Sequence, residues 1–257
     1  MTGFIARIGA RTILFLEEVG RVTYFSTRIL ATIFHRPPRI RRFLDEVFGI
    51  GVMSLIIICV CGLAVGAVLG LQGYHTLERF GATDSLGTVV GLSLIRELGP
   101  VMTALLTTGR AGSATTAEIG SMAATEQLDG LRMMSIDPIH YVVTPKALAM
   151  VAVMPLLSGL FIVCGIAGGY LVGVYWGVDP GSFLTGLESA VEFRDDVVGS
   201  FLKALIFGIL IGLISTYRGY TSAPTSEGVS EATTATVVEA SVCILVFDYF
   251  ITALWGV

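Results

Sequence analysis

Charged residues inside long apolar segments constrain this chain more than any other feature. An adjacent Arg96–Glu97 pair lies in an otherwise apolar segment, 85–109, and Glu239 and Asp248 lie in a second one, 237–257. A charge at the centre of a bilayer costs roughly 3 kcal/mol on insertion scales, so such residues are kept where they pair, line a cavity or contact a partner. These charges therefore predict a function at membrane depth.

The composition is that of an integral membrane protein. Of the 257 residues, 54% are hydrophobic and 14% are charged, against roughly 25% charged in a soluble domain. A transmembrane helix needs about 20 mostly apolar residues. We expect an all-α polytopic protein with an N-terminal segment, 1–46, and one transmembrane domain, 47–257. Its five predicted spans are 47–74, 85–109, 147–176, 201–217 and 237–257.

The distribution of Lys and Arg orients these spans. Cytoplasmic loops are enriched in both residues. Eight arginines precede Val47, and the loops on the same side contain Arg110, Arg132, Lys146 and Arg218. The alternate loops contain only Arg79 and Arg194, among several acidic residues. We therefore expect the N-terminus in the cytoplasm and the C-terminus outside.

The N-terminal segment has the pattern of an amphipathic helix. Apolar residues recur at roughly helical spacing from Ile5 to Ile29, with arginines between them, and the sequence His35-Arg-Pro-Pro-Arg39 breaks the helix. This pattern favours a helix lying on the inner membrane face; a cytosolic helix packed on a partner is the alternative. The segment lacks the compact apolar core and the small-residue cleavage site of a signal peptide.

Three spans carry glycines spaced by four: Gly62, Gly66 and Gly70 in the first, Gly165, Gly169 and Gly173 in the third, and Gly208 and Gly212 in the fourth. Such strips let helix backbones approach closely in lipid, either within one chain or across a dimer. Five spans make a narrow bundle for a central transport path, so we expect a homodimer.

The segment 110–134 is too polar to span. Its small and apolar residues suit one face of a short cytoplasmic surface helix or of a helical hairpin. Such a helix can insert into a groove of a cytosolic partner, with Glu118 and Glu126 paired to basic groups there. A solvated loop helix is the alternative.

Several kinds of chemistry have no motif in this sequence. It contains neither the phosphate-binding pattern GxxxxGK[ST] nor HExxH, and its four cysteines fit neither a redox nor a zinc pattern. We expect no catalytic residue, metal or cofactor in this chain, and no nucleic-acid partner. If ATP drives transport, the ATPase is another chain.

A series of short motifs begins inside the second span and continues after it in a specific order. They are Arg96-Glu-Leu-Gly-Pro100, Gly109-Arg-Ala-Gly-Ser113, Ala117-Glu-Ile-Gly120, Thr125-Glu-Gln127 and Asp137-Pro138. With Gly70-Leu-Gln-Gly-Tyr74 and Pro224-Thr-Ser226, these motifs make the chain resemble the MlaE/YrbE permease family strongly from about residue 47 to the C-terminus.

The resemblance implies a permease subunit of an ABC transporter. Members of this family work as homodimers in the inner membrane of Gram-negative bacteria, where they move glycerophospholipid between the two membranes and maintain outer-membrane asymmetry. The implied partners are a cytosolic ATPase (MlaF) that holds ATP and Mg²⁺, a STAS-domain protein (MlaB) bound to that ATPase, and a periplasmic hexamer of an MCE-domain protein (MlaD). The direction of transport and the choice of head group stay open.

The resemblance also implies roles for individual residues. The helix at about 114–131 corresponds to the coupling helix that docks in the ATPase, and its expected contacts are Glu118, Glu126 and Gln127. The positions that match the family's lipid pocket are Leu69, Tyr74, Leu77, Phe80 and Leu98, with Arg96 and Glu97 beside them. The charged pair would contact neighbouring polar groups, the lipid head group, or each other as a structural ion pair. Lys203 and Asp248 are candidates for a second membrane pair.

The alternative function belongs to another class. A proton- or ion-coupled secondary carrier would use Arg96, Glu97 and Asp248 as a relay. It would run on an ion gradient without an ATPase. The third hypothesis is a purely structural scaffold, which would tolerate Glu97→Gln without loss of transport.

Overall fold

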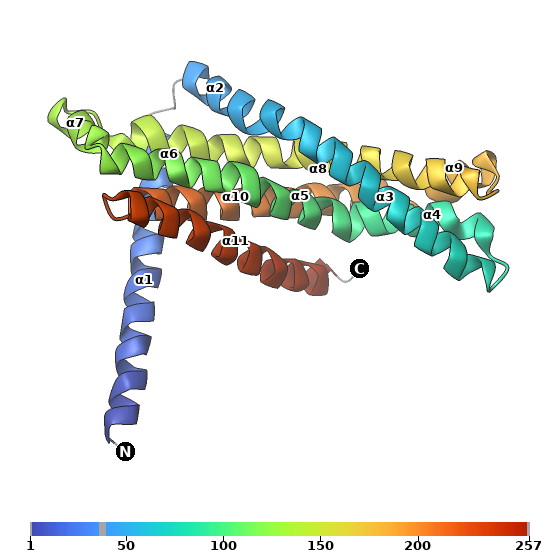
Figure 1. The fold of residues 1–257 in the computed structure, drawn as a ribbon, viewed down its shortest axis with the longest axis horizontal. Coiled ribbons are helices and arrows are strands. Elements are labelled where there is room, and N and C mark those ends of the chain that lie inside the picture. Colours follow the sequence, from blue (N-terminus) through green and yellow to red (C-terminus); the bar gives the residue numbers. More distant parts are fainter. Residues whose placement is uncertain (1, 36–39, 256–257) are drawn as a thin grey trace.

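The computed structural model describes residues 2–35 and 40–255, with side chains at 13, 16–33 and 40–254. Every regular element in these ranges is helical, as predicted. Five segments are long and apolar enough to cross a membrane: Ile40–Glu78, Thr83–Ala124, Ile139–Tyr175, Phe193–Tyr220 and Ser226–Leu254. They overlap the five predicted spans. Each begins earlier than predicted, and the first, second and fourth also end later, since hydrogen-bonded helix continues past the apolar stretches. The spans run side by side along the long axis (Figure 1).

Turns divide the spans into shorter helices. The first span consists of α2 (Ile40–Gly51), the 3₁₀ turn η1 (Val52–Ser54) and α3 (Leu55–Glu78). The second consists of η2 (Thr83–Ser85), α4 (Leu86–Ser93), the π-helical turn η3 (Leu94–Leu98), α5 (Gly99–Thr107), the π-helical turn η4 (Thr108–Gly112) and α6 (Ser113–Ala124). The remaining elements are α1 (Thr2–His35), α7 (Gln127–Met133), η5 (Ile139–Val143), α8 (Thr144–Tyr175), α9 (Pro180–Ala190), η6 (Phe193–Val197), α10 (Val198–Tyr220) and α11 (Ser226–Trp255).

The glycine strip of α3 packs against α8 within the same chain. A Cβ atom at Gly62 would lie 2.8 Å from the Phe161 carbonyl oxygen, and one at Gly70 would lie 2.9 Å from that of Gly169. A Cβ atom at Gly66 would overlap the carbonyl group of Gly165. The intramolecular alternative is therefore correct for this strip, and close backbone contact fixes α3 on α8.

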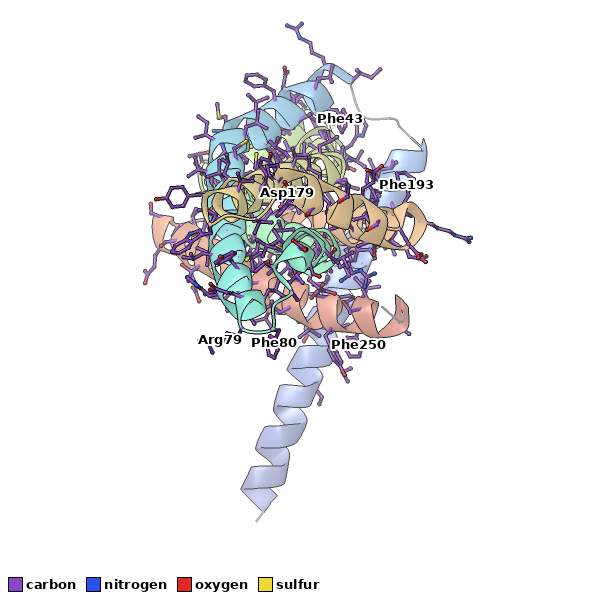
Figure 2. All side chains as sticks on the ribbon, turned by 90° about the vertical axis from the view of Figure 1, so that its right-hand side faces the viewer. Phe43, Arg79, Phe80, Asp179, Phe193 and Phe250 are labelled. Atoms are coloured by element: carbon purple, nitrogen blue, oxygen red, sulfur yellow. The ribbon has the colours of Figure 1, made fainter. Side chains whose placement is uncertain are left out.

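The two ends of the bundle differ. One carries α7, and the other carries α9 and the turn between α3 and α4 (Figure 1). The sequence starts α9 at Pro180, whose lack of an N–H costs nothing in the first turn, after Asp179, whose carboxylate accepts from the Ser182 N–H at 2.9 Å. Figure 2 views this end, with Arg79 and Phe80 in the turn that follows α3. We call it the α9 end, and the other the α7 end.

The N-terminal helix α1 runs across the direction of the spans and leaves the bundle at the α7 end (Figure 1). Among its described side chains, the buried ones lie in its later part: Phe25 and Ile29 are buried, and the Phe25 ring lies 5.5 Å from that of Tyr217. Ile13 and Leu16 stay more than 60% exposed. The side chains of the pattern that precede Ile13, and the predicted break at 36–39, lie outside the described residues.

The segment 110–134 forms two helices, α6 and α7, rather than one. The first of them is not the separate surface helix that the polarity of the segment predicts. The first half of the segment, α6, continues the second span, and α7 begins only after Glu126, whose φ of 58° is left-handed. The polarity of α6 has another cause: its threonines lie between helices. The buried Thr116 hydroxyl lies 3.0 Å from the Ser215 carbonyl oxygen of α10 and 3.0 Å from the Thr236 hydroxyl of α11.

Candidate functional site

The Arg96–Glu97 pair lies in η3, where the second span widens to a π-helical turn. Pro100 follows at the start of α5 and has no N–H to donate to the carbonyl of Arg96, four residues earlier. The Lys203 ammonium donates to that carbonyl at 3.0 Å instead. Arg96 lies ten residues after the start of α4, or roughly 15 Å at 1.5 Å per residue, so the pair is deep within the span.

Lys203 joins the second, fourth and fifth spans. Its side chain is 7% exposed and lies 2.9 Å from a Glu97 oxygen and 3.4 Å from an Asp248 oxygen. It also donates to the Thr252 hydroxyl at 2.8 Å, and that hydroxyl donates to Glu97 at 3.1 Å. The predicted contact between Lys203 and Asp248 is confirmed, and Glu97 belongs to the same cluster.

Arg96 pairs with a different partner. Its Nε atom donates to Asp196 at 2.6 Å, and the Asp196 side chain is 0% exposed. The second oxygen of Asp196 accepts from the backbone N–H of Glu192 at 2.8 Å, which fixes the carboxylate at the start of η6. Arg96 and Glu97 thus each contact a neighbouring polar group of the protein, and each has its own partner.

The space among these charges is small. A cavity of about 20 Å³ is lined by Arg96, Glu97, Asp195, Asp196, Gly199, Ser200, Lys203, Ile251 and Thr252. This volume is the size of one water molecule and much smaller than a phospholipid head group. In this conformation the cluster ties the second, fourth and fifth spans together, and the buried Asp248 Oδ1 atom makes an ion contact but no hydrogen bond.

The apolar positions predicted to hold lipid lie near the α9 end. Leu69, Tyr74, Leu77 and Leu98 are partly buried and pack against the main core. Phe80 lies apart from them, 79% exposed in the turn after α3. The Tyr74 ring lies 5.8 Å from that of Trp176, the residue that follows α8. The structure therefore brings four of the five positions onto the core and leaves Phe80 at the surface.

A polar cleft of about 600 Å³ opens at the α7 end, among α2, α6, α7, η5 and α8. It is lined by Arg42, Asp45, Glu46, Glu118, Ser121, Met122, Gln127, Tyr141, Val142, Pro145 and Lys146. Glu118 and Gln127, two predicted contacts of a cytosolic partner, thus share one cleft. Glu126 is exposed just before α7.

A buried lysine crosses this cleft. The Lys146 side chain is 4% exposed, and its ammonium lies 2.8 Å from a Glu46 oxygen on α2 and 2.8 Å from a Glu118 oxygen on α6. Both carboxylates stay partly exposed, at 28% and 59%. The lysine therefore lies at the junction of three helices, and its partners face solvent.

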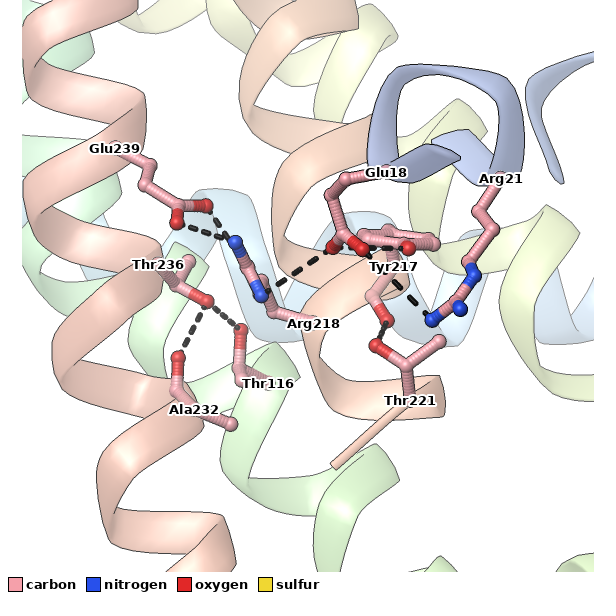
Figure 3. Close-up of polar contacts among 9 residues, drawn as sticks. All are labelled: Glu18, Arg21, Thr116, Tyr217, Arg218, Thr221, Ala232, Thr236 and Glu239. Carbon is pink, nitrogen blue, oxygen red and sulfur yellow. Dashed lines mark hydrogen bonds and ion pairs between the residues drawn. The ribbon is translucent and has the colours of Figure 1, made fainter. Parts of the chain in front are cut away.

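A second polar network at the α7 end includes the N-terminal helix (Figure 3). Arg218 on α10 forms a bidentate pair with Glu239 on α11 and lies 3.7 Å from Glu18 on α1. The Tyr217 hydroxyl donates to Glu18 at 3.1 Å. This network and the buried Phe25 hold the later part of α1 on α10.

Sequence reasoning missed three participants in these networks. Asp196 was counted only as an outer-loop acid, although its spacing to Ser200 and Lys203 puts all three on one helix face. Lys146 was used only to orient the spans. Glu46 belongs to a pair 100 residues apart, and nothing in the local sequence indicates that contact.

Within the described ranges, no three His, Cys, Asp or Glu side chains gather as a metal site would require.

The chain was compared with known proteins. The family model described as "Permease MlaE" matches residues 43–254. The intermembrane phospholipid transport system permease protein MlaE of Haemophilus influenzae is 46% identical over 99% of this chain and 98% of that protein. A probable ABC transporter permease protein of Rickettsia bellii is 41% identical over 96% of each chain. Protein TRIGALACTOSYLDIACYLGLYCEROL 1, chloroplastic, of Arabidopsis thaliana is 32% identical over 83% of this chain and 61% of that protein.

Proposed function

This chain belongs to the MlaE permease family, and on that premise we propose that it is the membrane subunit of an ABC transporter that moves glycerophospholipids between the inner and outer membranes and so maintains outer-membrane asymmetry. One observation carries the proposal: the chain is similar along nearly its whole length to a permease named for intermembrane phospholipid transport.

We place the lipid at the α9 end, near the apolar side chains of α3 and η3. Leu69, Leu77 and Leu98 offer apolar surface for acyl chains, and Tyr74 supplies a ring with a polar tip near the interface. Arg96 is half-buried, with 37% of its side chain exposed. When its bond to Asp196 loosens, its guanidinium is available to a phosphate, whose geometry it matches.

The proposed assembly is a homodimer. In the most apolar 18-residue stretch of the fifth span, only 11% is buried within the chain. The corresponding share is 44% in the second and third spans. Exposed Val242, Leu245 and Tyr249 lie along α11, and a second copy would cover this surface. A lipid pocket at the seam would then draw side chains from both copies.

We place the coupling to ATP at the α7 end. Glu118, Glu126 and Gln127 would contact an MlaF-like ATPase that holds ATP and Mg²⁺ and is itself bound to an MlaB-like protein. An MlaD-like hexamer would face the α9 end. ATP-driven closure expels a lipid only if the closed state binds it less well than the open state.

The α7 end faces the cytoplasm in this proposal, and the chain resides in the inner membrane. The basic residues of the predicted cytoplasmic loops, Arg110, Arg132 and Arg218, lie toward that end. Because α1 runs across the spans there, it would lie along the inner membrane surface, with Ile13 and Leu16 in the apolar layer.

Purification of the chain from its native host in mild detergent tests the proposal, with mass spectrometry of co-eluting proteins and lipids. An ATPase, an MCE-domain protein and stoichiometric phospholipid are expected together. The complex is then placed in vesicles with a fluorescent phospholipid, and lipid movement is expected only with hydrolysable ATP. Movement driven by a proton gradient in the absence of any ATPase would instead favour the secondary carrier.

A further inference from the structure

The cytoplasmic half of the first span is less buried than the other half: Phe43 and Val47 of α2 pack only partly buried against the core, and polar contacts add to this packing. Among the described residues of α2, only Ile50 is buried, whereas glycine-to-backbone contacts fix α3 on α8. The two halves meet at η1, a 3₁₀ turn preceded by Gly49 and Gly51. A change of helix type beside glycines is a place where a helix bends readily.

Three polar contacts hold α2, and all of them lead to the region next to α6 and α7. Arg42 donates to the Tyr141 carbonyl of η5 at 3.0 Å, and its guanidinium lies 3.3 Å from the Tyr141 ring centre. Arg110 of η4 donates to the Ser54 hydroxyl at 2.7 Å and to the Ile50 carbonyl at 3.2 Å. Lys146 supplies the third contact, through Glu46.

Lys146 differs from the other two because it binds two helices at once. Its Glu118 partner lies on α6, beside the cleft that also contains Gln127 at the start of α7. Its Glu46 partner lies on α2. A shift of α6 therefore acts on α2 through one ammonium group, at a point where the cleft otherwise separates the two helices.

We propose that Lys146 is a positioning residue that transmits the ATPase-driven movement of α6 and α7 to α2, by holding Glu118 and Glu46 together while the first span bends at η1. The inference rests on the proposed function. Through the Lys146 bridge and α2, a movement at the cytoplasmic end reaches α3, the helix that carries three of the proposed lipid-contact positions.

The test compares lipid moved per ATP hydrolysed in vesicles that contain the full transporter complex. Lys146→Met keeps the length of the side chain and removes its charge, and the two freed carboxylates are already open to solvent. Because the bridge is proposed to transmit movement rather than to support hydrolysis, the ratio is expected to fall about 5-fold or more while ATP hydrolysis stays within about 2-fold. Lys146→Arg, which keeps the charge, is expected to restore the ratio of lipid moved to ATP hydrolysed.

Two further variants make the test decisive. Glu46→Gln breaks only the α2 arm and is expected to lower the same ratio, which keeps the test valid if Lys146→Met does not assemble. Arg41→Met is the matched control, an exposed cation on the same helix, and is expected to leave the ratio unchanged.

A distance measurement separates transmission from simple stability. Spin labels at the exposed positions Asp45 on α2 and Ser121 on α6 are expected to keep their separation on ATP binding in the wild-type complex, and to move apart in Lys146→Met. An unchanged ratio in Lys146→Met and Glu46→Gln would overturn the inference, as would a proportional loss of hydrolysis and transport. If the wild-type complex moves no lipid with ATP, the proposed function fails instead.

Discussion

Removal of the Lys203 ammonium tests whether the membrane-depth network holds three spans together. Lys203→Met is nearly isosteric, but it takes the donor from the Arg96 carbonyl and the cation from Glu97 and Asp248. Breaking a buried ion pair from one side costs about 3–5 kcal/mol, because the partner charge remains. The Asp248 side chain is only 19% exposed, so we expect the free energy of unfolding to fall by this amount.

A double-mutant cycle supplies the control. Asp248→Asn relieves the stranded charge, so the double variant should be more stable than the sum of the two single effects predicts, by about 1–2 kcal/mol. Arg79→Met, at an exposed position near the α9 end, should stay within about 0.5 kcal/mol of wild type. The assay is reversible unfolding in mixed micelles of a mild detergent and dodecyl sulfate. A loss below about 1 kcal/mol in Lys203→Met, or strict additivity in the cycle, would refute the reasoning.

Other contacts give shorter predictions. Gly66→Ala places a methyl group on the backbone of α8 and should cost about 1–3 kcal/mol in the same unfolding assay, whereas Gly159→Ala, with open space around it, should cost nothing; equal effects would contradict the packing described. Arg110→Met removes the charged donor at η1. Amide hydrogen exchange at 51–55 should therefore accelerate about 10-fold, as expected for the loss of a charged hydrogen bond. An unchanged exchange rate would show that the contact does not hold the turn. Tyr217→Phe deletes the hydroxyl bond to α1 and should weaken exchange protection in the later part of α1 alone; a uniform loss would point to global destabilisation.

Hydropathy predicted the spans because a bilayer leaves the backbone few choices. A chain in lipid must satisfy its peptide groups internally, so an apolar segment of sufficient length becomes a helix whatever its neighbours are. The same argument gave a wrong prediction for α6, which was expected to be too polar to belong to a span but continues the second one. Thr115 and Thr116 lower its hydropathy, yet both are buried. The Thr116 hydroxyl bonds to α10 and α11, and a hydroxyl group with such partners is compatible with burial.

The charged sites were predictable only as residues, not as pairs. The cost of charge at membrane depth singled out Arg96 and Glu97 from sequence alone. Their partners lie on other spans, with Asp196 100 residues from Arg96, and only the packing of spans against one another decides which partner each obtains. Adjacency in sequence was misleading, because residues i and i+1 on a helix point in different directions.

The two buried lysines differ in the surroundings of their carboxylates, and this difference matches the tasks proposed for them. Lys203 meets its partners around a cavity the size of one water molecule, so separating them would expose charge to an apolar medium, and the joint should stay closed throughout a transport cycle. Lys146 meets its partners beside a cleft of about 600 Å³, where water can solvate both carboxylates as the helices shift. The Lys203 cluster therefore keeps the second, fourth and fifth spans together at membrane depth, while the Lys146 bridge lets α2 and α6 move together at the cytoplasmic end and so passes their movement to α3.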